Sequence, residues 1–211
     1  MATSAIHLLS FKALFLVAST LARRASELAA LRADAPYLQF FPVKVVLYPD
    51  ASFLLKVVSS FHPNQSLTVL TLFPKPSSEV EHMLHSLDVC RAMTYYTSWT
   101  KDLYTSPKLF LCFHGPHKGS PASLSKVSRW IVSTIALAYE LAGKVPPEGL
   151  KAHSTWAVAT STALLHGVDV PDICRAATWY NVSTFVMDYR LDLWAKKEAS
   201  FGRVVLTLIL E

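Results

Sequence analysis

The sequence contains few cysteines and few glycines. Its 211 residues include three cysteines, Cys90, Cys112 and Cys174, whose wide spacing excludes a disulfide framework and a Cys-x-x-Cys metal site. Only six residues are glycine, while 52% are hydrophobic and 11% aromatic, a composition that excludes a disordered chain. We therefore expect one globular domain in a reducing compartment, with a substantial core and buried thiols.

Long hydrophobic runs are also absent. The apolar stretch at residues 13–22 is about half as long as the roughly 20 residues that cross a bilayer. Arg23 and Arg24 follow this stretch, whereas a signal peptide carries its positive charge in front of the apolar run. A buried helix is the better interpretation, and we expect no membrane association.

Acidic residues are scarce in one part of the chain. The formal net charge is +5, and residues 91–130 contain six lysines and arginines against the single acid Asp102. Such a concentration of positive charge can neutralise phosphate groups, and a solvated surface is the alternative.

The spacing of apolar residues predicts both helices and short strands. Helical spacing covers residues 10–31 as one or two helices, and then residues 77–96, 123–141, 152–165, 171–178 and 182–193. Short β-rich runs cover residues 37–41, 44–48, 66–73 and 109–113. We expect a mainly α-helical fold with a small antiparallel β-sheet inserted between helices, an α+β architecture.

Near the N-terminus, an arginine precedes a glutamate by three residues. The stretch reads Ala22-Arg-Arg24-Ala-Ser-Glu27-Leu. Ion pairs at this spacing are common on helix surfaces, so the pattern alone predicts only a helix whose end Glu27 buttresses.

Three residues near the C-terminus carry groups suited to phosphate chemistry. His153 lies in the stretch Lys151-Ala-His-Ser-Thr-Trp156, Trp179 follows Ala-Ala-Thr178, and Tyr189 follows Phe185-Val-Met-Asp. A phenol can attack a phosphodiester and hold the strand covalently, and an indole N–H can donate to a phosphate. Taken singly, each of the three is equally a structural residue.

Together these positions resemble the active site of the tyrosine recombinases, and the intervals from His153 to Trp179 and Tyr189 fit that family closely. The resemblance implies DNA cleavage and rejoining through a transient 3′-phosphotyrosyl link, with no metal or other cofactor. Guanidinium groups would hold the phosphate and a lysine would protonate the leaving 5′ oxygen. It assigns Arg24, His153 and Trp179 to the phosphate and Tyr189 to the nucleophile.

The family lysine lies in a hairpin turn of the small sheet. Lys56 is the assigned residue and Lys44 the alternative, and either is equally a charge at a strand end. Contacts to DNA are expected from the basic segment, through Arg91, Lys118, Lys126 and Arg129.

One position departs from the family pattern. The family has His-x-x-Arg, and Trp156 stands where the arginine belongs. An indole supplies neither a cation nor a two-pronged donor, and losing a transition-state arginine slows such reactions by about 1,000- to 100,000-fold. The chain is therefore expected to be a weakened or inactive recombinase, or else a catalytically dead, transposon-derived DNA-binding or interaction module.

From about residue 10 to residue 205, the chain resembles the recombinase of DIRS-type retrotransposons. This implies a single catalytic domain over residues 1–211, without the N-terminal DNA-clamp (core-binding) domain. It also implies double-stranded DNA as the partner, homo-oligomers on paired DNA sites, a role in DNA integration and a nuclear location. The remaining alternatives are a helical protein with coincidental motif matches and a type I topoisomerase, of which no specific region is present.

Overall fold

The computed structural model describes residues 2–53, 66–72 and 75–177. Lys56, Trp179 and Tyr189 lie outside the described residues, as does the helix expected at residues 182–193. The chain divides into two compact units, residues 1–156 (unit 1) and residues 157–211 (unit 2). The expectation of one catalytic domain over residues 1–211 stays a prediction.

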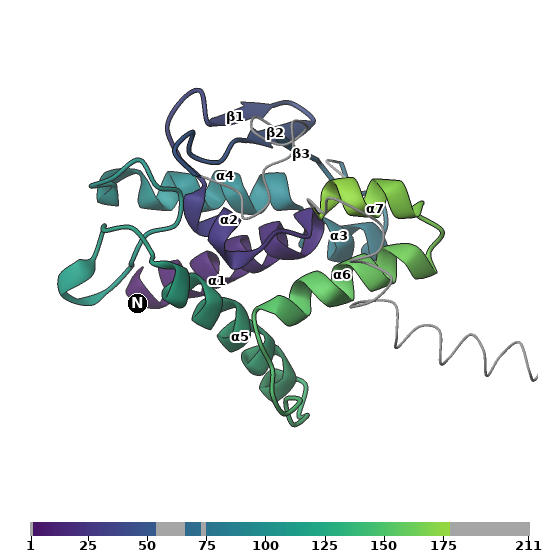
Figure 1. Cartoon of the computed structure of the whole chain (residues 1–211). Helices are drawn as coiled ribbons and strands as arrows, with labels where there is room; N and C mark the ends of the chain where they lie inside the picture. The colour runs from purple at the N-terminus through teal and green to yellow at the C-terminus, as the bar shows by residue number, and fades with distance from the viewer. Residues whose placement is uncertain (1, 54–65, 73–74, 178–211) are drawn as a thin grey trace, which may run out of the picture. The chain divides into compact units, whose positions relative to one another are not determined.

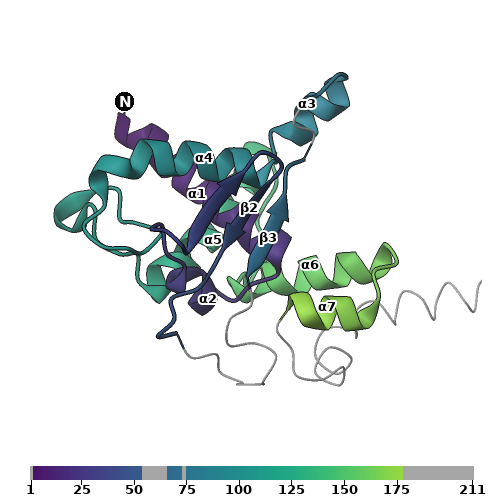
Figure 2. The same ribbon diagram turned by 90° about the horizontal axis from the view of Figure 1, so that it is seen from above.

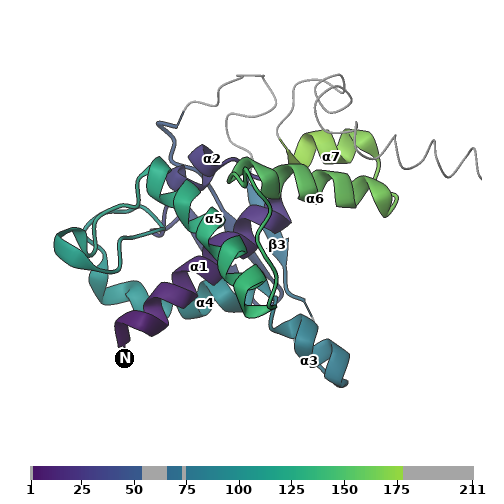
Figure 3. The same ribbon diagram turned by 90° about the horizontal axis from the view of Figure 1, so that it is seen from below.

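Unit 1 is built around its first helix, α1 (Ala2–Leu21). Two later helices, α4 (Val89–Thr100) and α5 (Leu124–Leu141), pack against α1 from opposite sides (Figures 1 and 3). Leu14 and Val17 of α1 are fully buried in the core between them. A short helix, α2 (Ala25–Ala30), follows α1, so the helical pattern expected at residues 10–31 is confirmed as two helices.

Three short antiparallel strands form a sheet in the order β1-β2-β3, with bounds β1 (Leu38–Phe41), β2 (Lys44–Leu47) and β3 (Leu67–Leu70). In the register, Leu47 pairs with Leu38 on one side and with Leu67 on the other. All three leucines are buried, because this part of the sheet covers α1 and α4 (Figure 2). The expectation of a mainly α-helical fold with a small antiparallel sheet is confirmed.

The helix expected over residues 77–96 is divided in two, α3 (Glu79–His85) and α4. Asp88 causes the division. Its carboxylate accepts the N–H of Arg91, 2.5 Å away, and so caps the start of α4. It also accepts the N–H of Leu72, so a single buried side chain joins the end of the sheet to the helix.

The strand expected at residues 109–113 is wrong. These residues are buried, but they make only isolated bridges, and their backbone groups bond to loops. The N–H of Leu109 donates to the carbonyl of Leu31 (2.8 Å), and the carbonyl of Phe110 accepts the N–H of Ala122 (2.8 Å). The segment therefore contributes side chains to the core without joining the sheet.

An ion-pair network around Asp50 joins the loop after β2 to the segment before Leu109. Lys108 Nζ lies 2.9 Å from Asp50 Oδ2, and a guanidinium nitrogen of Arg32 lies 3.8 Å from the same oxygen. Ser52 donates both its N–H and its hydroxyl to Asp50 Oδ1. The hydrogen bond from Lys108, followed by those from Ser52, lowers the pKa of the Asp50 carboxyl far below its ordinary value.

The two remaining helices are α6 (His153–Leu165) and α7 (Val170–Ala176), which confirm the helices expected at residues 152–165 and 171–178. Unit 2 contains α7 and α6 from Ala157 onward. Within the described ranges, no helix is both long and apolar enough to cross a membrane.

Candidate active site

Two of the predicted site residues, Arg24 and His153, lie beside the indole of Trp156, the residue that stands in place of the family arginine. The guanidinium carbon of Arg24 lies 5.1 Å from the centre of the Trp156 ring, and the His153 ring centre lies 4.7 Å from it. Trp156 is only 2% exposed, so its indole is buried. The structure thus brings Arg24, near the N-terminus, to His153 and Trp156 at the start of α6.

A tight turn between α1 and α2 places Arg24. Ala22 has φ = 47°, in the left-handed region, so the backbone leaves the helical path directly after α1. Arg24 then occupies the N-cap position of α2, where its own N–H donates to Glu27 Oε2 at 3.2 Å. Glu27 therefore supports the start of the helix, and the side chain of Arg24 is left half-buried, directed to Trp156.

His153 is the first residue of α6, as the sequence predicts, and its side chain is exposed. Just before it, the N–H of Lys151 donates to the hydroxyl of Ser154 and the N–H of Ser154 donates to the carbonyl of Lys151. These bonds fix the entry into α6. Trp156 follows one turn later, on the side of the helix directed to the interior.

Sequence reasoning missed the neighbour of Arg24. Arg23 is 8% exposed, and one of its terminal nitrogens lies 3.8 Å from Glu27 Oε2. Burial lowers the pKa of Arg23, and the charge of Glu27 opposes this effect. The spacing of four residues between Arg23 and Glu27, typical of an ion pair on a helix, is the sequence signal for this contact.

The identity of the lysine is not decided by the described residues. Lys44 begins β2, next to the two-residue turn after β1, and its ammonium lies 5.1 Å from the centre of the Phe41 ring. Lys56 falls between β2 and β3, outside the described residues. Both assignments stay predictions.

The four residues expected to contact DNA lie on different elements. Lys126 and Arg129 are one turn apart on α5, while Lys118 follows a short 3-10 helix at Gly115–His117. Arg91 lies in the first turn of α4, with its guanidinium 5.5 Å from the Tyr95 ring centre. Arg91, Lys118 and Arg129 are exposed, and Lys126 is half-buried with its ammonium 3.1 Å from Cys112 Sγ.

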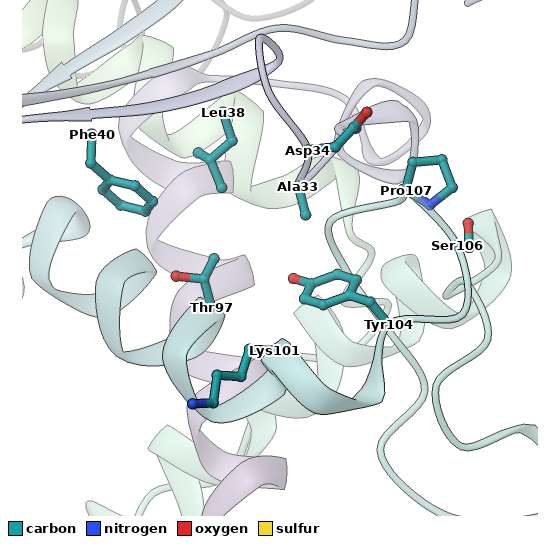
Figure 4. Close-up of a pocket in the computed structure, with 9 residues that line it drawn as sticks. All are labelled: Ala33, Asp34, Leu38, Phe40, Thr97, Lys101, Tyr104, Ser106 and Pro107. Atoms are coloured by element: carbon teal, nitrogen blue, oxygen red, sulfur yellow. The ribbon is translucent and has the colours of Figure 1, made fainter.

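A pocket of about 450 Å³ opens elsewhere on unit 1, between β1 and the end of α4 (Figure 4). Leu38 and Phe40 line one side, and Thr97 and Tyr104 line the other. Of the predicted catalytic residues that the structure describes, none lines it. It is therefore separate from the meeting point of Arg24 and His153.

The described residues contain no cluster of three or more histidine, cysteine, aspartate or glutamate side chains that could hold a metal ion. The three cysteines are free and buried, as expected. Burial raises the pKa of the Cys90 and Cys174 thiols. The groups that lie around the indole of Trp156 are the guanidinium of Arg24 and the imidazole of His153.

Comparison with known proteins identifies the fold. No protein-family model and no curated protein matches the sequence. Among solved structures, the chain is similar to the XerH site-specific recombinase, in a crystal structure of its post-cleavage complex with a palindromic difH substrate. The TM-score is 0.55 at 12% identity, over 89% of this chain and 44% of that chain. This chain thus spans less than half the length of that protein, and its fold is the α+β fold of a tyrosine-recombinase catalytic domain.

Proposed function

We propose that the chain is a DNA-binding tyrosine-recombinase domain whose strand cleavage is weakened or abolished by Trp156. One observation carries the proposal. Arg24 and His153, two residues that the recombinase pattern assigns to the scissile phosphate, both contact the residue that stands in place of the second arginine. The solved structure with the similar fold is a complex with a DNA substrate, which supports the same substrate class here.

Local charge supports a phosphate as the ligand. Arg23 and Arg24 are consecutive cations; the guanidinium of Arg23 pairs with Glu27, whereas Arg24 bonds to Glu27 through its backbone N–H. α2, which begins after Arg24, packs against α5, which carries Lys126 and Arg129. A cation cluster beside a basic helix suits a phosphodiester backbone, because each neutralised phosphate releases counterions.

In the proposed chemistry Tyr189 is the nucleophile, Trp179 binds the phosphate, and Lys56 or Lys44 protonates the leaving 5′ oxygen. In the proposed reaction, the phenol gives its proton to the His153 imidazole as its oxygen forms a bond to the phosphorus, and the bond to the 5′ oxygen breaks. The leaving oxygen takes a proton from the lysine. We place the activity in the nucleus, on paired double-stranded DNA sites bound by homo-oligomers, in a protein derived from a DIRS-type retrotransposon.

Covalent trapping tests the proposal. Nicked duplex DNA of mixed sequence is incubated with the natural chain, Trp156→Arg, and Trp156→Arg combined with Tyr189→Phe. We expect an adduct on Tyr189 with Trp156→Arg, a weak or absent adduct with the natural chain, and none with the double variant. If the double variant forms as much adduct as Trp156→Arg, Tyr189 is not the nucleophile. If a folded, DNA-binding Trp156→Arg protein forms no adduct, the claim that Trp156 alone blocks cleavage is refuted.

A second candidate function is DNA binding without catalysis. The burial of Trp156 against Arg24 favours it, because no second guanidinium occupies that position. Under this function all three proteins bind duplex DNA with the same dependence on salt and none forms an adduct.

A further inference from the structure

Arg23 and Arg24 are consecutive in sequence, but the turn between α1 and α2 gives them different surroundings. The positive φ of Ala22 turns the backbone, and the N–H of Arg23 donates to the carbonyl of Ala18 at 3.4 Å. As a result the side chain of Arg23 lies in the interior at 8% exposure, whereas that of Arg24 is half-buried against Trp156.

The interior surroundings of Arg23 are unfavourable for a cation. Burial lowers its pKa, and its Nε has no hydrogen-bond partner within the described part of the chain. A terminal nitrogen of Arg23 lies 3.8 Å from Glu27 Oε2, a distance beyond a normal hydrogen bond. A buried ion pair of this kind stabilises a fold no better than apolar residues of the same size, and its best-attested use is to specify one arrangement.

One oxygen atom of Glu27 links Arg23 to the backbone of Arg24. Glu27 Oε2 is the atom that faces Arg23, and it is also the atom that accepts the N–H of Arg24 at 3.2 Å. The charge of Arg23 therefore orients the carboxylate that holds the backbone of Arg24. The guanidinium of Arg24 is in turn the group that lies 5.1 Å from the Trp156 ring centre.

We propose that Arg23 is a positioning residue, which acts through Glu27 to hold the Arg24 guanidinium at the candidate phosphate site. The importance of this position for DNA rests on the proposed function, but the link from Arg23 to Arg24 does not. Without Arg23, the carboxylate of Glu27 turns away, the first turn of α2 loosens and the Arg24 side chain leaves the indole.

Nuclear magnetic resonance of the arginine side chains in the full chain tests the link without DNA. A guanidinium stacked on an aromatic ring has resonances displaced by the ring current. The chain contains its own control, because the guanidinium carbon of Arg32 lies 4.1 Å from the Tyr37 ring centre and Arg32 bonds to Asp34, outside this turn. Trp156→Phe identifies the part of the Arg24 displacement that comes from the indole.

We expect Arg23→Met to remove about half or more of the Arg24 displacement and to leave that of Arg32 unchanged. Arg23→Lys, which keeps the charge, should restore part of it. An unchanged Arg24 signal in a folded Arg23→Met protein overturns the proposal, because it shows that Arg23 only fills the interior.

Glu27→Gln provides a second route if Arg23→Met does not fold. A glutamine side chain carries no charge, so its carbonyl oxygen loses the attraction to the Arg23 guanidinium that orients the carboxylate. We expect Glu27→Gln to displace Arg24 while Arg32 stays in place, and an unchanged Arg24 signal here also overturns the proposal. The double variant should move Arg24 no further than either single variant, since the two residues act in series.

Duplex DNA binding is then measured separately with the natural chain, Arg23→Met and Arg24→Met. If the proposed function holds, Arg23→Met weakens DNA binding in the same direction as Arg24→Met, and the two losses are not additive. If the natural chain does not bind DNA, the proposed function fails while the resonance result for Arg23 stands.

Discussion

The guanidinium carbon of Arg24 lies 5.1 Å from the centre of the Trp156 ring. Trp156 occupies the position at which the recombinase pattern has its second arginine. A partly desolvated contact of this kind contributes about 0.5–2 kcal/mol. The indole is also among the largest fully buried side chains that the structure describes. The residue that weakens the proposed chemistry is therefore part of what holds the fold together.

Trp156→Ala should lower the free energy of unfolding by about 3–5 kcal/mol, because it removes a buried aromatic ring and leaves a cavity. Denaturant unfolding followed by circular dichroism measures the change. Trp99→Ala is the matched control, since Trp99 is 51% exposed and its loss should change stability by about 0.5 kcal/mol or less. Equal midpoints for the two variants contradict the buried position of Trp156.

Trp156→Arg should destabilise the free protein and make it respond to anions. The new guanidinium enters a buried place near Arg24, where Glu27 already interacts with Arg23 and with the backbone of Arg24. An anion that binds only the folded state offsets this repulsion, so added phosphate or duplex DNA should raise the melting temperature more than in the natural chain.

Trp156→Met is the control for this response, because it also loses the indole but adds no charge. Thermal melts are compared with and without phosphate at constant ionic strength. A phosphate response that is the same in Trp156→Arg and Trp156→Met shows that the new arginine does not complete an anion site.

The sequence predicted the elements of the fold better than the contacts of the site. Helical spacing located α5, because its buried residues Val127, Trp130 and Ile131 recur about once per turn. The break before α4 was not predicted, because it depends on Asp88, which caps α4 and also accepts the N–H of Leu72 from a distant segment. Residues 109–113 were assigned to a strand because a buried apolar run looks the same whether its backbone pairs with a strand or a loop.

The sequence predicted which residues form the candidate site, but not the surroundings of their side chains. The recombinase pattern selected Arg24 and His153, and the structure brings both to Trp156. The pattern could not predict that the replaced arginine position is filled by a buried indole, nor that Arg23 is interior. Both facts depend on the turn at Ala22, whose positive φ has no signature in an alanine.

Neutralising the basic residues of α5 should change how DNA binding depends on salt. Each lysine or arginine that contacts a phosphate contributes roughly one unit to the slope of log K against log salt concentration. Lys126→Gln and Arg129→Gln should each reduce the slope by about 1, as measured by fluorescence anisotropy over a salt series. Lys12→Gln, an exposed change on α1 outside the basic segment, should leave the slope unaltered, and equal slopes for all proteins argue for a merely solvated face.

The Asp50 network predicts how stability changes in acid. Hydrogen bonds from Lys108 and Ser52 lower the pKa of Asp50 in the folded state, so the carboxylate stabilises the fold above its unfolded pKa of about 4. This contribution is lost as the pH falls below 4, because protonation then favours the unfolded chain.

Asp50→Asn should therefore lower the free energy of unfolding at pH 7 by about 1–2 kcal/mol, since it removes hydrogen bonds to a charged group. The difference from the natural chain should shrink as the pH is lowered from 5 towards 2, where Asp50 itself becomes protonated. Denaturant unfolding at each pH measures both curves, with Asp102→Asn as the control for removing an exposed aspartate. A constant difference between the Asp50→Asn and natural curves over this range means that the network does not lower the pKa of Asp50. The partial slope that remains in Asp50→Asn is expected to include Asp34, whose pKa is lowered by its hydrogen bonds from Arg32.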